Sequence, residues 1–256
     1  MDFDSPLPID IQASQPLFGS EAKEVRAAMK QLDVNGLRSA MKMSQDLAVR
    51  TQQLYADDNP PTKPALWTYV GDVYRGVQSA TMTQADADWA QTHLMIASGL
   101  YGLLRPQDAV SPYRLEMAAR LTIGESENLY QYWSLKLAKY IESTGTKELV
   151  VLSSDEYARA AIKNLSPSIA VYTPRFFDTK PNGVVGQVPI YNKQMRGVMA
   201  RWMIDNRVED ASELVKFNQH DYVYDESRSL PKDPVFTRQV MRPLDLPSKV
   251  GLQSAR

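Results

Sequence analysis

The segment from Ser98 to Arg120 constrains the fold of this chain more than any other, because turn residues divide it into short pieces. It reads SGLYGLLRPQDAVSPYRLEMAAR. Two glycines, an Arg-Pro step and a Ser-Pro step favour turns and lead into the run PYRLEM. If this run is extended, Arg114 and Glu116 point to the same face, because side chains alternate along a strand. The pair is either a surface ion pair or, in a concave site, an anion clamp beside a proton-accepting carboxylate.

The composition is that of an ordinary globular protein, with 43% hydrophobic and 23% charged residues. No apolar run approaches the roughly 20 residues that span a bilayer, and the first residues lack the features of a secretory signal. We therefore expect a cytoplasmic protein that makes no membrane contact. The absence of cysteine excludes disulfides and thiol peroxidase chemistry. His93 and His220 lack partners at metal-ligand spacing, so we expect structural or surface histidines, no metal and no cofactor.

The overall charge of −1 does not favour a dedicated nucleic-acid-binding protein. One region is nevertheless locally positive, and binding responds to the local field rather than to the sum. Between residues 175 and 207, only Asp178 and Asp205 are acidic. The basic residues of this region are Arg175, Lys180, Lys193, Arg196, Arg201 and Arg207.

Hydrophobic periodicity predicts a mixed α/β fold. Helices are expected from Ser20, in two further short segments to about Tyr55 with Ser44 as a cap, and over about 83–97, 128–142 and 191–207. Strands are expected at 65–70, 148–154, 221–226 and 234–240, and 169–177 is expected to form a hairpin with 183–190. The loop at 57–64 lies, in this interpretation, inside one domain. We predict a single domain over 1–240 and a C-terminal tail over 241–256.

Two segments have the pattern of a strand followed by a helix. In GDVYRGVQ (71–78), Gly71 allows a backbone turn and Asp72 can cap the helix. This segment is either a phosphate site or a plain junction. In SDEY (154–157), the polar residues follow a strand of the buried type, at the end where open α/β sheets form clefts. They either line such a cleft or only cap the next helix.

The segment 191–207 has the clearest helical pattern. Its core-facing residues are Met195, Val198, Met199, Trp202 and Met203. Lys193, Arg196 and Arg207 lie in a narrow arc beside that stripe. Gly197 and Ala200, in or near the same arc, would let a large partner come close. The arc is either a solvated basic face or an edge that binds nucleic-acid phosphates.

These motifs occur in one collinear order from the N-terminus almost to Arg238, and together they resemble the YaaA family of bacterial peroxide-stress proteins. The matching segments are GDVYRGVQ, SGLYGLLRPQD, PYRLEM, LYQYW, SDEY, KQMRG and DYVYDE. The resemblance implies a single-domain α/β fold with a positively charged cleft and a helix-hairpin-helix-like element. It also implies DNA binding, protection of DNA during peroxide stress and a lowered level of free intracellular iron.

The resemblance gives two functional hypotheses and a third, inactive alternative. The first is non-specific binding of double-stranded DNA through Arg105, Lys193, Arg196 and Arg207. The second is an enzyme that transfers an amide or hydroxamate group to or from a small carboxylate, a small anionic ligand of the cleft, although no nucleophile can be named. The third is an inactive, truncated paralogue. The expected cleft residues are Asp72, Tyr74, Ser98, Gly99, Tyr101, Tyr113, Arg114, Glu116, Asp155, Glu156 and Tyr157.

Three departures from the family pattern bear on DNA binding. Family chains usually begin with a strand and the phrase SPAKT, and Met1 falls inside the segment that follows, so we expect that strand and its lysine to be missing. The family tends to have two adjacent lysines where this chain has Lys193 and Gln194. The turn from Gly99 to Gly102 is one residue longer than the usual glycine-x-glycine hairpin that holds DNA phosphates.

Overall fold

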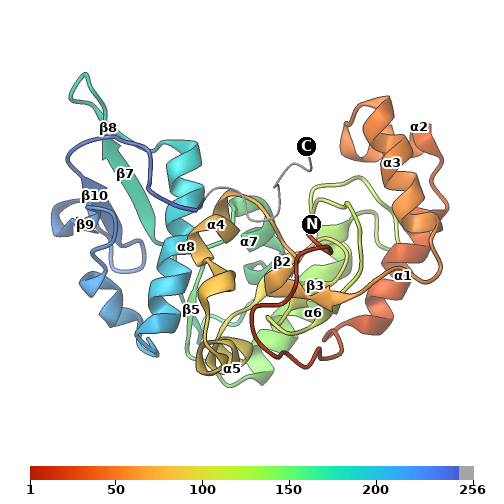
Figure 1. Cartoon of the computed structure of the whole chain (residues 1–256), viewed down its shortest axis with the longest axis horizontal. Coiled ribbons are helices and arrows are strands. Elements are labelled where there is room, and N and C mark those ends of the chain that lie inside the picture. The colour runs from red at the N-terminus through yellow and green to blue at the C-terminus, as the bar shows by residue number, and fades with distance from the viewer. Residues whose placement is uncertain (248–256) are drawn as a thin grey trace.

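A computed structural model describes residues 1–247 of the chain as a mixed α/β single domain (Figure 1). Helices α1–α3 lie at one end of the long axis, and the largest sheet lies at the other, with the remaining elements between them. The α-helices are α1 (Gly19–Lys30), α2 (Val34–Met41), α3 (Gln45–Ala56), α4 (Asp72–Val77), α5 (Gln84–His93), α6 (Leu129–Ser143), α7 (Asp155–Ile162) and α8 (Pro189–Asp205). Short 3₁₀ turns are η1 (Ala65–Trp67), η2 (Ser79–Thr81), η3 (Ala211–Lys216) and η4 (Glu226–Arg228).

The strands form one larger sheet and three small pairs. In the four-stranded sheet, with order β8-β7-β10-β9, β7 and β10 are parallel and the outer pairs are antiparallel. The pairs β1–β4 and β2–β3 are antiparallel, and β5–β6 is parallel. The strands are β1 (Lys63–Pro64), β2 (Ile96–Ser98), β3 (Gly102–Leu104), β4 (Ala109–Val110), β5 (Glu148–Val150), β6 (Ala170–Tyr172), β7 (Arg175–Thr179), β8 (Val185–Gly186), β9 (Val223–Tyr224) and β10 (Val235–Arg238).

Local capping explains where several helices begin. The Ser44 side chain accepts a hydrogen bond from the Leu47 N–H at the start of α3, as the sequence predicts. Asn128 caps α6 in the same way. Thr83 and Asp86 form a reciprocal capping box at the start of α5. These side chains satisfy N–H groups that have no partner within the helix.

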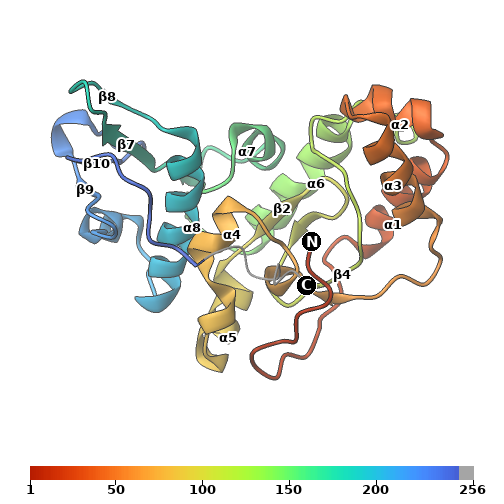
Figure 2. The same ribbon diagram turned by 45° about the horizontal axis from the view of Figure 1, so that its top comes forward.

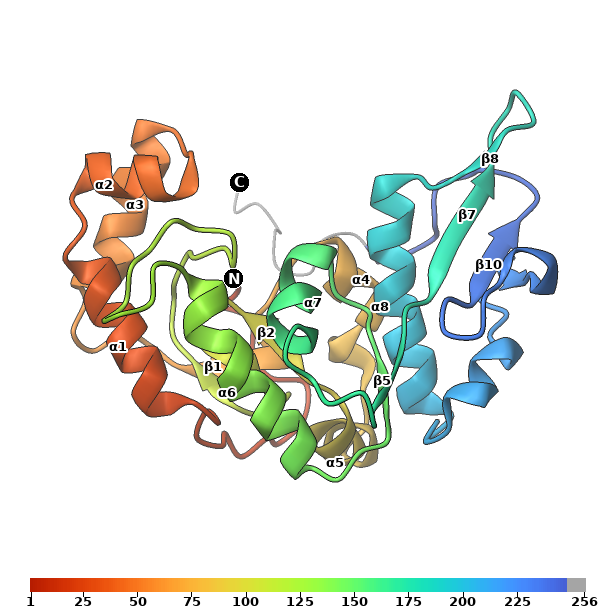
Figure 3. The ribbon, with the colours of Figure 1, turned by 180° about the vertical axis from the view of Figure 1, so that it is seen from behind.

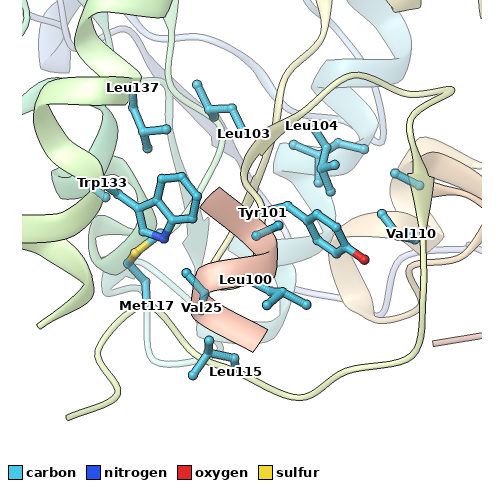
Figure 4. Packing of buried hydrophobic residues seen from close by; sticks show 14 of the residues in the cluster. Val25, Leu100, Tyr101, Leu103, Leu104, Val110, Leu115, Met117, Trp133 and Leu137 are labelled. Carbon is cyan, nitrogen blue, oxygen red and sulfur yellow. The ribbon is translucent and has the colours of Figure 1, made fainter. Parts of the chain in front are cut away.

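The larger core lies around Trp133 of α6, between α1 and the β2–β3 hairpin (Figure 4). Trp133 and Leu137 are fully buried. Gly102, with a φ of +68°, closes the hairpin directly against them, and a Cβ there would lie 2.8 Å from the Trp133 ring. The turn therefore requires glycine both for its backbone conformation and for space.

A second core fills the space between α8 and the four-stranded sheet (Figure 3). Met195 and Met199 of α8 are fully buried, as the helical stripe predicts, and they belong to the same cluster as Phe176 of β7. Leu244 and Leu246 are buried in this cluster as well. The first part of the predicted tail, up to residue 247, thus packs on the domain, and the rest of it lies outside the described residues.

The structure corrects three expectations about local structure. Residues 65–70 do not form a strand, because Ala65–Trp67 is a 3₁₀ turn in which the three side chains are buried. The helix expected over 83–97 ends at His93, and Ile96–Ser98 is strand β2. Asp72 does not cap α4, since the N-cap is Gly71 at a φ of +141°.

The other expected helices are present, and the strands expected at 148–154, 221–226 and 234–240 are present in shorter form as β5, β9 and β10. The expected strand 169–177 is divided between β6 and β7, which belong to different sheets. Strand β7 forms the predicted hairpin with β8, whereas residues 189–190 of the expected second strand belong to α8. Within residues 1–247, no helix has both the length and the apolar character needed to cross a membrane.

Candidate functional site

Hydroxyl groups from three separate segments of the chain meet at Tyr113, and two of these segments are among those that resemble the family. The Tyr113 hydroxyl lies 2.6 Å from the Tyr69 hydroxyl and 2.7 Å from Ser98 Oγ. Ser98 Oγ in turn accepts a hydrogen bond from the Tyr101 N–H at 3.0 Å. Strand β2 therefore ends in a hydroxyl network that joins the segment after η1 to the PYRLEM segment.

Four aromatic rings surround this network, and we call Tyr69, Tyr74, Tyr101 and Tyr113 the tyrosine cluster. Tyr69 and Tyr74 are stacked with ring centroids 5.4 Å apart, and Tyr113 contacts both Tyr69 and Tyr101 edge-on. Burial raises the pKa of Tyr113 to about 12 and raises the pKa values of Tyr69 and Tyr74 further. The hydroxyls therefore stay neutral at physiological pH and act as hydrogen-bond donors rather than bases.

The sequence interpretation missed Arg26, which connects α1 to this region. Its guanidinium donates to Ser111 Oγ at 2.6 Å and to the Pro112 carbonyl at 3.2 Å. Ser111 also hydrogen-bonds the Tyr101 hydroxyl, at 3.1 Å. Nearby, the Tyr55 hydroxyl donates to the Arg114 carbonyl at 3.0 Å. Helices α1 and α3 thus hold the start of the PYRLEM segment in place.

Burial alternates along the PYRLEM segment, in the way expected of an extended run. Leu115 and Met117 are buried, whereas Arg114 and Glu116 are exposed on the other face and lie 3.4 Å apart. Gly99 lies against this segment, and a Cβ on it would be 2.6 Å from the Leu115 carbonyl oxygen. With side chains 44% and 52% exposed, the Arg114–Glu116 pair has the solvation of a surface ion pair.

Helix α7 brings the SDEY segment to the end of PYRLEM. Glu156 Oε1 accepts a hydrogen bond from the Ala118 N–H at 3.0 Å. Tyr157 is half-buried, and its pKa is raised by burial first, then by Tyr113, Glu156 and Glu116. Because Tyr113 and Glu116 both affect its pKa, Tyr157 lies near the tyrosine cluster and near the PYRLEM segment.

Helices α4 and α8 touch through two glycines. A Cβ on Gly197 would lie 1.8 Å from the Val73 carbonyl oxygen, and one on Gly76 would lie 2.3 Å from the Gln194 carbonyl oxygen. The expectation that Gly197 and Ala200 admit an external partner is wrong, because both are buried inside the protein. The close packing instead fixes α8 beside α4, which carries Tyr74.

Asp72 and Asp155 stand at the starts of two helices. Asp72 lies 3.7 Å from Arg75, which also donates to the Pro247 carbonyl at 2.9 Å. Asp155 is exposed, and the negative charge of its carboxylate favours the protonated form of Arg196 in α8, which raises the pKa of that arginine. Among the described residues, neither carboxylate makes a hydrogen bond to the tyrosine cluster.

Arg196 is half-buried beside the start of α7. Its Nε is buried and has no hydrogen-bond partner within residues 1–247. Burial lowers the pKa of Arg196, Asp155 acts in the opposite direction and Arg175 lowers it further. Lys193, one turn earlier, is exposed. The first half of α8 thus presents two cations, one of them with unused hydrogen-bonding capacity.

The other two predicted DNA-binding arginines have partners inside the protein. Arg105 Nη2 lies 2.8 Å from the fully buried carboxylate of Asp108 and also donates to the Gln15 carbonyl. Arg207 Nη2 lies 2.8 Å from Asp86, and its guanidinium stands over the Trp89 ring. Both arginines thus pair with acidic groups of the protein itself, in contrast to Lys193 within the described residues.

A model of the family described as peroxide stress protein YaaA matches residues 1–228. The chain belongs to this family. It is 37% identical to the UPF0246 protein of Roseobacter denitrificans over 239 residues, 90% of this chain and 92% of the relative. It is 35% identical to the UPF0246 protein of Laribacter hongkongensis over 247 residues, covering 93% and 95%. A UPF0246 protein of Salinispora tropica is 38% identical over 228 residues, covering 88% and 86%.

The tyrosine cluster, α7 and α8 all lie within the part matched by the YaaA family model. This part contains Tyr69, which the sequence interpretation missed because it treated residues 65–70 as a strand. The aromatic residues Tyr69 and Tyr74, five positions apart across a glycine, were the available signal. Within residues 1–247 of this YaaA-family protein, no three acidic or histidine side chains gather closely enough to hold a metal ion.

Proposed function

We propose that this protein binds double-stranded DNA without sequence specificity during peroxide stress and so limits iron-dependent oxidative damage to DNA. Family membership supports the connection with peroxide. The observation that carries the DNA-binding part is the pair of exposed cations where α2 meets α3, Arg38 and Lys42, together with the two cations of α8.

Helices α2 and α3 are joined by only three residues, 42–44. We assign the expected helix-hairpin-helix-like element to this pair, because the Gly99–Gly102 turn connects two strands and is buried. Arg38 and Lys42 are exposed, and neither forms an ion pair within the described part of the chain. Two exposed cations, one in the last turn of α2 and one before the N-terminus of α3, favour backbone phosphate.

The first turns of α8 add to this surface. In Figures 1 and 2, the α2–α3 pair and the N-terminal end of α8 lie on the same side of the molecule, with α7 between them. Lys193 is exposed and Arg196 is half-buried. Cations at separate points along one side can neutralise phosphates along a duplex without contacting bases.

Duplex binding and DNA protection can be measured on the same samples. Fluorescence anisotropy with several duplexes of unrelated sequence should give similar dissociation constants, because phosphate contacts carry no sequence information. Plasmid DNA mixed with the protein should then be nicked more slowly by ferrous iron and hydrogen peroxide. Binding to one sequence alone, or unchanged nicking at saturating protein, would contradict the proposal.

A second candidate function is amide or hydroxamate transfer on a small carboxylate, and the hydroxyl network at Tyr113 favours it. Neutral tyrosine hydroxyls that converge from different segments can donate to a carbonyl or carboxylate oxygen. The test is to supply a carboxamide and hydroxylamine, which exchange to a hydroxamate and ammonia, and to detect the hydroxamate by its ferric complex. Product that forms with the protein and is lost in Tyr113→Phe, but not in Tyr140→Phe, would support an enzyme.

A further inference from the structure

A second polar site, separate in its residues from the tyrosine cluster, lies beside the four-stranded sheet. Its pocket has a volume of about 280 Å³. The residues that line it are His220, Arg238, Arg242, Pro243, Leu244 and Asp245. Most of them follow residue 228, where the family match ends, so the site is a feature of the C-terminal part of this chain.

Arg238 is the central group of this pocket. Its side chain is 1% exposed, and its guanidinium lies between the rings of Tyr191 and Tyr222, 4.9 and 4.8 Å from their centroids. Nε donates to Asp178 Oδ1, and Nη2 donates to the Arg242 carbonyl at 2.6 Å. Tyr222 donates to the other Asp178 oxygen at 2.9 Å. The guanidinium is therefore held rigidly in one orientation.

One nitrogen of Arg238 is left over. Nη1 is buried and has no hydrogen-bond partner within residues 1–247. Buried donors in folded proteins are almost always satisfied, and a guanidinium N–H is best satisfied by a carboxylate or another oxyanion. An unpaired donor on a residue that lines a pocket points to a ligand that brings its own acceptor.

The remaining charges at the pocket restrict the kind of anion. Arg242 is paired with Asp221 on the surface. Asp245, which lines the pocket and is exposed, forms no ion pair within the described residues. Burial first, and then the neighbouring Arg238, lower the pKa of His220, which disfavours a charged imidazole beside Asp245. Asp245 would repel a dianion such as phosphate. A ligand that carries one negative and one positive group could instead place the first on Arg238 and the second on Asp245.

We propose that this pocket binds a small amino acid, with its carboxylate on Arg238 Nη1 and its ammonium group on Asp245. A zwitterion satisfies the buried donor and the free carboxylate at once, and it adds no net charge to the pocket. Pro243 and Leu244 then leave an apolar wall for a short side chain.

Calorimetric titration of the full chain with glycine, alanine, acetate and inorganic phosphate tests this assignment. Glycine and alanine should bind at one site per chain, acetate about tenfold more weakly, and phosphate more weakly still. Acetate binding as tightly as glycine, or no saturable binding of either amino acid, would overturn the proposal.

Variants separate a specific site from a general effect. Asp245→Asn should weaken glycine binding by about tenfold and should not weaken acetate binding, because acetate has no ammonium group and is repelled by this carboxylate; the exposed Glu226→Gln should change neither. Since Arg238→Gln removes a buried ion-pair partner and can fail to fold, NMR of ¹⁵N-arginine-labelled wild-type protein provides the complementary measurement. Glycine should shift one buried guanidinium signal, and an unchanged arginine spectrum at saturating glycine would refute the assignment.

Discussion

The backbone of Gly197 in α8 lies against the Val73 carbonyl oxygen in α4, where an added Cβ would come within 1.8 Å. This contact joins the helix that carries Lys193 and Arg196 to the helix that carries Tyr74. It also brings the second core next to the segment that enters the tyrosine cluster. The relative position of the two parts of the molecule therefore depends on a glycine rather than on a large side chain.

Substitution of this glycine should be severely destabilising. In Gly197→Ala the Cβ would overlap backbone, which cannot rotate away, so we expect a loss of at least about 3 kcal/mol in the free energy of unfolding. Urea denaturation measures it. Gly19→Ala is the matched control, because a Cβ at Gly19 meets nothing within 4 Å. Equal stability of the two variants would show that α4 and α8 are less closely packed.

Removing the Tyr113 hydroxyl should cost about 1–2 kcal/mol, because the Tyr69 hydroxyl and Ser98 Oγ both lose a partner in a buried site. Tyr113→Phe keeps the ring and its edge-on contacts. The half-buried Tyr140 packs edge-on against Phe18, and Tyr140→Phe should be close to neutral. Chemical denaturation of both variants checks the difference, and a neutral Tyr113→Phe would mean that the network adds no stability.

The raised tyrosine pKa values predict a loss of stability at alkaline pH. Tyr113 has a folded-state pKa of about 12 against an ordinary value of 10.0. Its contribution is complete below pH 10 and declines as pH rises through 12, because the unfolded chain loses this proton first. Denaturation midpoints measured across that range should fall, and they should fall less in Tyr113→Phe. If the denaturation midpoints of the wild type and Tyr113→Phe fell by the same amount, Tyr113 would not be the cause of the alkaline loss of stability.

Arg105 should matter for folding and not for DNA. Arg105→Gln leaves the buried Asp108 carboxylate without its cation, and we expect a loss of about 3 kcal/mol or more in stability. If the variant still folds at low temperature, its affinity for duplex DNA should equal that of the wild type. A stable variant with weakened DNA binding would instead show that Arg105 contributes to DNA binding.

The features that follow from local sequence were predictable, and those that depend on distant partners were not. The extended PYRLEM segment, the Ser44 cap and the buried methionines of α8 follow from periodicity and capping chemistry within a few residues. The partner of Arg207 is Asp86, 121 positions away, so nothing near Arg207 in the sequence marks it as paired. The helical projection placed Arg207 beside Lys193, but α8 ends at Asp205 and the Arg207 side chain pairs with α5.

The same reasoning explains the errors at Gly197 and Tyr69. A glycine in a helix indicates a close approach, but the sequence does not say whether the neighbour is a DNA molecule or the protein's own α4. Tyr69 follows the β-rich letters ALWT, whose pattern favours a strand. The burial of all three residues of the 3₁₀ turn Ala65–Trp67 overrides that local preference.

The dependence of duplex binding on salt tests the central claim most directly. Each phosphate contact contributes a slope of about −0.9 to the logarithm of affinity against the logarithm of salt concentration. Replacing Arg38 and Lys42 by glutamine, or Lys193 and Arg196, should flatten that slope by about one to two units in each case. The matched control Lys216→Gln/Arg228→Gln, with the same loss of charge on exposed cations elsewhere, should retain the wild-type slope. An affinity that does not change with salt concentration would contradict the proposed DNA-binding surface. Equal slopes for the wild type, the two test variants and the control variant would contradict it as well.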